Sequence, residues 1–342
     1  MSTSRAPELL AKAHGMLAGV AVGDALGMPT EFLTRETIAE WYGTVDGLVR
    51  ADARHPHHRL PAGSVTDDTD HTVLLARLLL EDGEVTAKAW ASKLLEWGSS
   101  PRVQENRFVG PSTLKTLKAL EAGTPLEEVP RGGTSSGAAM RVAALAIAFA
   151  DRDRLAEQVV ASCAVSHFTR AAISSAMAMA FALAEALDER ATIDSIGAAA
   201  RDGAARGREH GDWSWTAPIE KRVDHVLGWA RSKTTEELLA LLYEVVGVDM
   251  YGDQLVPDAI ALAAAADGDP NRAMVLAANL GGDSDTLASM TGALCGAWRG
   301  VDAVSPSWLA QVEAVNGLDL AGLSEGLVAL RHRLSRGDRD AR

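Results

Sequence analysis

The sequence predicts an all-α protein, and three observations indicate this fold class. Apolar residues recur about every 3.6 positions along most of the chain, which is the spacing of one face of an amphipathic helix. Hydrophobic residues make up 47% of the 342 residues and aromatic residues only 5%, so Ala, Leu, Val and Met must build the core, which favours closely packed helices. Alternating strand patterns and hairpin turn signals are almost absent. We expect a compact bundle of about 13–16 helices.

The predicted helices follow one another from the start of the chain to its end. The helical spacing of apolar residues occurs in residues 8–26, 68–80, 87–96, 113–122, 137–150, 155–164, 171–187, 193–204, 217–231, 235–245, 256–265, 272–280, 285–298, 307–316 and 323–334. No clear internal repeat and no low-complexity linker divides them. We therefore expect one domain over residues 1–342, with the helices of residues 301–335 packed on the rest.

The first helix carries a stripe of glycines. Gly15, Gly19, Gly23 and Gly27 recur every four residues and so lie on one helix face. This stripe predicts close contact with another helix in the core. The helix should end near Gly27, where Met28 and Pro29 follow, and should thereby deliver Glu31 to a fixed place.

Charge and cysteine content narrow the functional classes. The formal net charge of −13 argues against a generic binder of nucleic-acid backbone. Cys163 and Cys295 lie in Ala-rich helical runs and are expected to be buried small apolar residues. Without a disulfide framework, the chain is expected in the reducing cytoplasm.

No membrane partner is expected from the sequence. The apolar stretch 15–28 is flanked by Lys12 and His14 and is interrupted by Asp24. It is too short to span a bilayer, and it lacks the charged start and cleavage pattern of a signal peptide. The stretch is therefore interpreted as part of a core helix.

Two short acidic segments far apart in the chain are the most informative local feature. Each holds two carboxylates with at least one hydroxyl, contains no Lys or Arg, and precedes an apolar helical run; the candidate ligands are Thr66, Asp67, Asp68, Asp283, Asp285 and Thr286. Two unneutralised carboxylates about 4 Å apart repel by about 1–4 kcal/mol. Carboxylate and hydroxyl oxygens suit Mg²⁺, Mn²⁺ or Ca²⁺ better than zinc. The two segments together predict a cation site.

Simpler interpretations of the acidic segments were weighed. Any one of these side chains could cap the helix that follows it. An EF-hand loop does not fit, because Leu287 stands where the third acidic ligand belongs. A phosphatase-type Asp-x-Asp-x-Thr motif does not fit either, because Thr286 follows Asp283 by only three residues.

Four motifs in order resemble one known family. Residues 15–32 contain Gly-Asp-Ala-Leu-Gly-Met-Pro, residues 66–69 read Thr-Asp-Asp-Thr, residues 132–141 read Gly-Gly-Thr-Ser-Ser-Gly-Ala-Ala-Met-Arg, and residues 281–286 read Gly-Gly-Asp-Ser-Asp-Thr. Their order and spacing resemble the ADP-ribosylglycohydrolase family over about residues 15–300. The resemblance implies an all-α fold and a two-metal site, with two Mg²⁺ or Mn²⁺ ions, that cleaves a glycosidic bond at ribose C1. It also implies that the six candidate ligands named above hold those ions.

The resemblance also implies further site residues. Glu31 matches an acidic residue placed near the reacting carbon, where a carboxylate accepts the proton of water or stabilises positive charge. Asp68 and Asp285 are expected to take part in catalysis as well. Substrate contacts are implied for Ser135, Ser136, Gly137, His167 and Tyr251: the first three as a phosphate-binding helix start, His167 in the pocket lining, and Tyr251 as an aromatic that stacks on the base.

Several expectations concern groups around the site. Some relatives carry an Asp with a general-base role where this chain has Phe108, so that role cannot be transferred. The irregular stretches 52–65 and 201–218 are expected to border the pocket. A metal site at His55, His57 and His58 is not expected, because Pro56 separates the first two and no partner carboxylate is evident. Asp70 and His71 are expected to support the first acidic segment from outside.

Three functions remain open from the sequence. The preferred hypothesis is a metal-dependent hydrolase that removes ADP-ribose from a modified target or from a small ADP-ribose derivative. The alternative is an N-glycosidase of nucleosides or ribosyl metabolites that uses the same metals. The third is a non-catalytic crystallin-like or binding protein, against which the complete set of six candidate ligands argues.

Overall fold

Helices make up most of the computed structural model, which describes residues 5–106 and 109–340. Within these residues the α-helices are α1 Arg5–Gly27, α2 Arg35–Tyr42, α3 Asp67–Asp82, α4 Ala87–Gly98, α5 Pro101–Asn106, α6 Pro111–Glu121, α7 Ala143–Ala148, α8 Arg152–Cys163, α9 Arg170–Ala186, α10 Ile193–Gly207, α11 Ile219–Ser232, α12 Thr235–Leu241, α13 Gly252–Ala265, α14 Pro270–Ala278, α15 Ser284–Arg299, α16 Pro306–Asn316 and α17 Leu320–Asp340. Extended pairing in the described ranges is limited to isolated bridges. The predicted all-α class is confirmed.

Two helices were not predicted, and one predicted helix was partly wrong. Helices α2 and α5 are short, and α2 buries only Ile38, so its apolar spacing is too weak to detect. The predicted helix over 137–150 begins instead as a 3₁₀ turn, Ser136–Ala138, and becomes α-helical only at α7. Residues 136–149 are buried on every side, so their apolar pattern could not distinguish a continuous helix from a turn followed by one.

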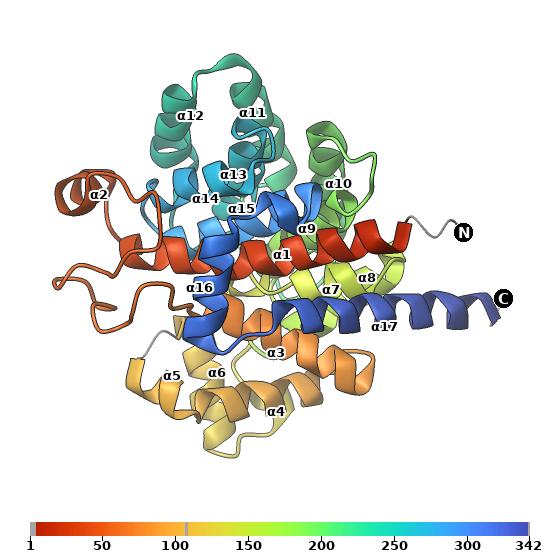
Figure 1. Cartoon of the computed structure of the whole chain (residues 1–342). Helices are drawn as coiled ribbons and strands as arrows, with labels where there is room; N and C mark the ends of the chain where they lie inside the picture. Colours follow the sequence, from red (N-terminus) through yellow and green to blue (C-terminus); the bar gives the residue numbers. More distant parts are fainter. Residues whose placement is uncertain (1–4, 107–108, 341–342) are drawn as a thin grey trace.

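Helices α1 and α15 lie side by side through the middle of the molecule (Figure 1). The predicted glycine stripe is the reason they pack so closely. A Cβ on Gly19 would stand 2.0 Å from the carbonyl oxygen of Gly292, and one on Gly27 would stand 2.2 Å from that of Ser284. Because the end of α1 touches the start of α15, the segment around Glu31 is brought to the second acidic segment.

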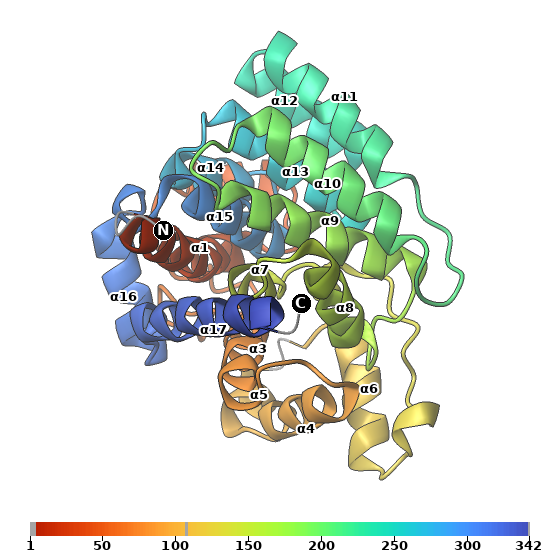
Figure 2. The same ribbon diagram turned by 90° about the vertical axis from the view of Figure 1, so that its right-hand side faces the viewer.

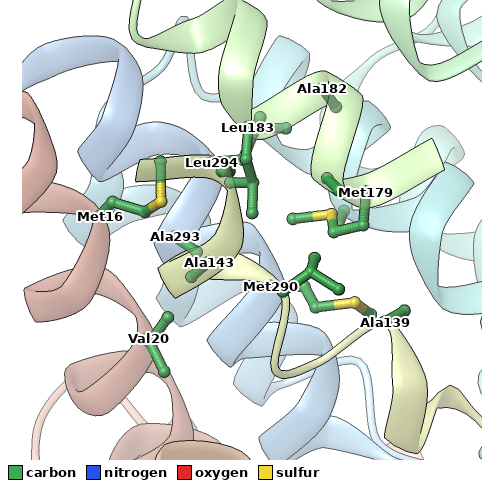
Figure 3. Close-up of a cluster of buried hydrophobic side chains, with 14 of the residues drawn as sticks. Met16, Val20, Ala139, Ala143, Met179, Ala182, Leu183, Met290, Ala293 and Leu294 are labelled. Atoms are coloured by element: carbon green, nitrogen blue, oxygen red, sulfur yellow. The ribbon is translucent and has the colours of Figure 1, made fainter. Parts of the chain in front are cut away.

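Small and flexible side chains fill the core around this helix pair. Figure 3 shows Met16 and Val20 of α1 beside Met290 of α15 and Met179 of α9, all at most 1% exposed. Removing a side chain of this size from water contributes about 1.5–3 kcal/mol. Cys163 and Cys295 are free thiols and buried, as the sequence predicted.

The remaining helices surround this centre. Helices α10, α11 and α12 form an outer layer over α9 and α13, while α4, α5 and α6 lie on the opposite side of the molecule (Figure 2). Helices α16 and α17 pack against α1, and α17 also contacts α3 and α7. The two acidic segments lie at the starts of α3 and α15, and both of these helices contact α1.

The first helix is longer than the sequence suggested. Residues Pro7–Thr30 are long and apolar enough to cross a membrane, which corrects the expectation that this stretch is too short. However, 78% of the apolar window is buried inside the protein. The apolar surface of this helix is therefore covered by neighbouring helices in the core.

Candidate active site

A pocket of about 340 Å³ opens where the start of α3, the start of α15 and the loop after α1 meet. Its lining includes Glu31, Asp67, Asp68, Ser135, Ser136, Gly137, His167, Asp283, Asp285 and Thr286. Candidate residues from five distant segments of the sequence therefore share one cavity. Its volume lies in the range of small-molecule sites.

Glu31 is held in place by a backbone exchange with the second acidic segment. It follows the 3₁₀ turn Met28–Thr30, and the next residue, Phe32, donates its N–H to the Gly282 carbonyl at 2.6 Å. Gly282 in turn donates to the carbonyl of Leu33 at 3.0 Å. Gly282 adopts a φ of 67°, and a Cβ there would stand 2.0 Å from the Val248 carbonyl oxygen, so only glycine fits. The pairing fixes Glu31 relative to Asp283.

The start of α3 is fixed by Asp24, which belongs to the Gly-Asp-Ala-Leu-Gly-Met-Pro motif but was not predicted to be a site residue. Its carboxylate is fully buried. It accepts hydrogen bonds from the backbone N–H and hydroxyl of Thr66, at 3.0 and 2.9 Å, and from those of Thr69, at 3.1 and 2.5 Å. A lone carboxylate within a glycine-striped core helix was the signal that could have identified it. These hydrogen bonds hold the first acidic segment in the position where it faces the second.

The two acidic segments converge. One carboxylate oxygen each of Glu31, Asp283 and Asp285 lies within 4.8 Å of the others. The Thr286 hydroxyl donates to Asp68 Oδ2 at 3.2 Å and thereby links the two segments directly.

Two of the carboxylate oxygens in this cluster have no protein partner. Asp68 Oδ1 and Asp285 Oδ1 are buried and accept no hydrogen bond. A bound water or ion is one way to satisfy buried oxygens of this kind. A set made of carboxylate and hydroxyl oxygens fits a hard divalent cation.

The simpler capping interpretation does not hold for the two residues at N-cap positions. Thr66 precedes α3 and Asp283 precedes α15, yet neither side chain makes a capping hydrogen bond with its helix backbone. The Thr66 hydroxyl donates to Asp24 and, at 3.4 Å, to Asp285 Oδ2. Asp283 Oδ2 accepts from the Ser136 hydroxyl at 3.2 Å. Both side chains therefore face the cluster.

The cluster is electrostatically costly without a cation. Burial, together with the charges of Asp67 and Asp24, raises the pKa of Glu31 to about 8. Burial, together with the charge of Glu31, raises the pKa of Asp283 to about 7. Burial and neighbouring carboxylates raise the pKa of Asp285 well above its usual value. Cation binding would displace these protons and relieve the repulsion.

His167 is built into the pocket wall beside the serine segment. Its Nε2 lies 2.9 Å from Ser135 Oγ, and its Nδ1 lies 2.7 Å from Ser166 Oγ. Gly137 packs against the ring, since a Cβ there would stand 2.9 Å from Nε2. These contacts order the Ser135–Gly137 wall.

Three structural details bear on the expected substrate contacts. The N–H of Ser136 donates to the Met250 carbonyl at 2.8 Å, so it is not free for a phosphate. Tyr251 is 42% exposed, and Met250 rather than Tyr251 is among the pocket-lining residues. The turn at Ser136 is also 3₁₀ rather than the start of an α-helix.

Asp70 and His71, expected to support the first acidic segment from outside, both contact Trp97. Asp70 pairs with Arg102 at 2.8 Å and accepts from Trp97 Nε1 at 2.9 Å. His71 is buried against Trp97, with ring centroids 4.4 Å apart. Neither Asp70 nor His71 lines the cavity. Phe108 lies outside the described residues.

The histidine segment does have a carboxylate partner, contrary to expectation. His55 and His57 line the pocket, and His57 Nε2 lies 2.9 Å from Glu31 Oε2. The partner was not evident in the sequence because Glu31 is more than twenty residues away and on a different turn.

The fold and the site together define an all-helical protein with a buried, carboxylate-lined pocket. The ADP-ribosylglycohydrolase family model matches residues 5–337, a wider span than the motifs indicated. The chain belongs to the ADP-ribosylglycohydrolase family and is a hydrolase of that type.

The chain matches its relatives and a solved structure along nearly its whole length. The chain is 33% identical to YegU of Escherichia coli, over 93% of this chain and 97% of that protein. It is 24% identical to the ADP-ribosyl-[dinitrogen reductase] glycohydrolase of Rhodospirillum rubrum, over 95% and 98%. A structure described as an ADP-ribosylglycohydrolase-related protein complex superposes with a TM-score of 0.73 at 26% identity, covering 95% of this chain and 99% of that chain.

Proposed function

We propose that this protein is a dinuclear-metal-dependent glycohydrolase that cleaves the glycosidic bond at ribose C1 and releases ADP-ribose from a modified target or from an ADP-ribose derivative. The observation that carries the proposal is the convergence of Glu31, Asp283 and Asp285 within 4.8 Å in a pocket where buried carboxylate oxygens lack partners. The relatives support the substrate class, since one of them, from Pseudomonas putida, is an ADP-ribosylarginine hydrolase, Tri1.

The residues proposed to hold two Mg²⁺ or Mn²⁺ ions come from both acidic segments: Thr66, Asp67, Asp68, Asp283, Asp285 and Thr286. Hard cations bound there supply positive charge that holds sugar hydroxyls and polarises water. Asp68 and Asp285 each present one unpartnered oxygen to the cluster. We assign both to the reacting end of the pocket.

Glu31 is the proposed proton acceptor. Its carboxylate faces the cluster and borders the cavity, so it can take a proton from water at the sugar carbon. Burial raises the pKa of Glu31 to about 8, which a nearby cation would lower toward the neutral range that suits a general base. Its negative charge also opposes the positive charge that builds at C1.

The other wall of the pocket is proposed to hold the rest of the substrate. Ser135, Gly137 and His167 line the cavity next to the carboxylates, with the His167 ring fixed by two serine hydroxyls. Ser136 assists by holding Asp283. Tyr251 lies at the margin, where a long substrate would reach it.

A second candidate is an N-glycosidase of nucleosides or ribosyl metabolites on the same site. The observation that favours it is the position of Tyr251, the aromatic expected to stack on a base, which does not line the cavity. A substrate without the diphosphate and adenosine would fit the carboxylate end alone. This alternative shares the residues of the first proposal and differs only in substrate length.

One experiment tests both candidates. The purified protein is incubated with ADP-ribosyl-arginine, ADP-ribosyl-serine, O-acetyl-ADP-ribose and simple nucleosides, with and without Mg²⁺ or Mn²⁺. Metal-dependent release of ADP-ribose supports the proposal, and turnover restricted to nucleosides supports the alternative.

Metal analysis after dialysis against Mg²⁺ and Mn²⁺ should give two ions per chain; fewer than one ion per chain would contradict the metal site. With two free buried thiols, the cytoplasm is the proposed compartment.

A further inference from the structure

We propose that His57 is a positioning residue that holds the Glu31 carboxylate in its reactive orientation, and that the loop of residues 51–60 exists to bring it there. The inference rests on the proposed role of Glu31. None of the four sequence motifs includes this loop, and its histidines lie beside Glu31 only in the folded chain.

The contact is direct and shielded from water. His57 Nε2 lies 2.9 Å from Glu31 Oε2, and the two side chains are only 11% and 13% exposed. With Glu31 ionised, the ring N–H donates to the carboxylate. Hydrogen bonds that involve an ionised group are stronger than neutral ones, and partial burial strengthens this one further.

A second histidine fixes the backbone of the same glutamate. His55 Nδ1 accepts from the His57 backbone N–H at 3.1 Å, so its proton must be on Nε2. That Nε2–H donates to the Glu31 carbonyl oxygen at 2.9 Å. The two rings therefore hold Glu31 at both its main chain and its side chain.

Glu31 needs such a partner because its other neighbours repel it. Its carboxylate lies within 4.8 Å of those of Asp283 and Asp285. Like charges at about 4 Å repel by about 1–4 kcal/mol, which favours rotation of Glu31 out of the cluster. His57 resists that rotation because its ring nitrogen binds Glu31 Oε2 directly.

The loop is anchored beside Glu31 by packing and by hydrogen bonds. Ala51 and Leu60, near the two ends of the loop, form a small hydrophobic cluster with Met28, apart from the main core. The Tyr42 hydroxyl donates to the Pro29 carbonyl at 2.9 Å and accepts from the Asp52 N–H at 2.7 Å. Both anchors tie the loop to the turn that delivers Glu31, so the histidines and the glutamate form one rigid unit.

Three variants separate positioning from general stability. His57→Leu removes the donor, His57→Gln returns an N–H near the position of Nε2, and Arg59→Gln changes an exposed residue of the same loop that does not line the pocket. We expect His57→Leu to lower kcat by about 10–100-fold, as loss of a supporting hydrogen bond does at other sites. KM and the Kd for ADP-ribose should change less than about threefold. His57→Gln should recover most of the loss, and Arg59→Gln should match wild type.

A double-mutant cycle makes the test specific to Glu31. In a Glu31→Gln background, the further change His57→Leu should leave kcat almost unchanged, because the side chain that His57 positions no longer accepts a proton. An equal loss in both backgrounds, or an unchanged kcat for His57→Leu alone, would overturn the proposal.

An activity-independent measurement distinguishes failure of this inference from failure of the proposed function. In the metal-free protein, the ¹⁵N NMR shift of His57 Nε2 should move on Glu31→Ala and stay unchanged on Arg59→Gln. No shift on Glu31→Ala would disprove the contact, whatever the substrate. If the shift moves but the wild type hydrolyses no ribosyl substrate, the proposed function fails and His57 has no proton acceptor to position, so the inference falls with it.

Discussion

Replacing Asp283 with Asn tests whether the carboxylates that would bind a cation lower the stability of the metal-free protein. Asp283 is 5% exposed and faces Glu31 and Asp285. Burial, together with the charge of Glu31, raises the pKa of Asp283 from 3.8 to about 7. Since one pKa unit corresponds to about 1.4 kcal/mol, ionising this carboxyl at neutral pH lowers the free energy of unfolding by about 4 kcal/mol.

The sign of the pH dependence follows from which state holds the proton more tightly. The folded protein does, so its advantage is complete below about pH 4 and is lost as the pH rises toward 7. Asn carries no charge at any pH. Metal-free Asp283→Asn should therefore equal the wild type near pH 4 and exceed it at pH 7 by up to about 4 kcal/mol.

Added Mg²⁺ should reverse the order of the two proteins. A cation that binds only the folded state adds about 2.7 kcal/mol when its concentration is 100 times its Kd. The free energy of unfolding of the wild type should rise by this amount, and that of Asp283→Asn should rise much less because the variant lacks one proposed ligand. Urea unfolding at pH 4.5 and pH 7.5, with EDTA or with Mg²⁺, measures all four conditions. Asp82→Asn, an exposed carboxylate at the end of α3, is the matched control.

The reasoning would be refuted by a metal-free Asp283→Asn that is less stable than wild type at pH 7.5 while both proteins gain equally from Mg²⁺. Asp283 would then be an ordinary structural carboxylate, stabilised by its bond from Ser136.

Four further outcomes are expected. Asp285→Ala should abolish metal-dependent turnover while the far-ultraviolet circular dichroism stays unchanged, and near-normal turnover would remove Asp285 from the site. Glu31→Gln should lower kcat by about 10²–10⁴-fold with ADP-ribose binding changed less than about tenfold, measured by steady-state kinetics and calorimetry. Asp24→Asn should weaken metal binding by about 10–100-fold, since Asp24 holds Thr66 and Thr69 through four donors; unaltered affinity in a metal titration would contradict this. Gly19→Val should lower the free energy of unfolding by at least about 1–3 kcal/mol in urea, because its side chain meets the α15 backbone.

Several features of this protein were determined by sequence patterns that act locally. Helical spacing and the low aromatic content predicted the all-α class, and the stripe from Gly15 to Gly27 predicted a close helix contact. Both predictions depend on the spacing of residues within a single helix, so they can be made without knowing which helix packs against it. The pattern failed where burial is uniform, as in residues 136–149, because a segment apolar on every side has no period to detect.

The composition of the site was also visible in the sequence, because two dense acidic segments without basic neighbours require a partner. Their convergence was not. It depends on α1 and α15 packing through glycine, which sets the end of one helix at the start of the other. Asp24 likewise became a site residue only when the fold placed it beneath the start of α3.

The histidine loop shows most clearly what only the tertiary structure decided. His57 and Glu31 are far enough apart in the sequence that no spacing rule pairs them. They meet because Met28, Ala51 and Leu60 pack together and because Tyr42 bridges the two turns. Local sequence determines which groups a segment offers, whereas contacts between distant segments determine which of those groups act together, because burial and charge are properties of the assembled fold.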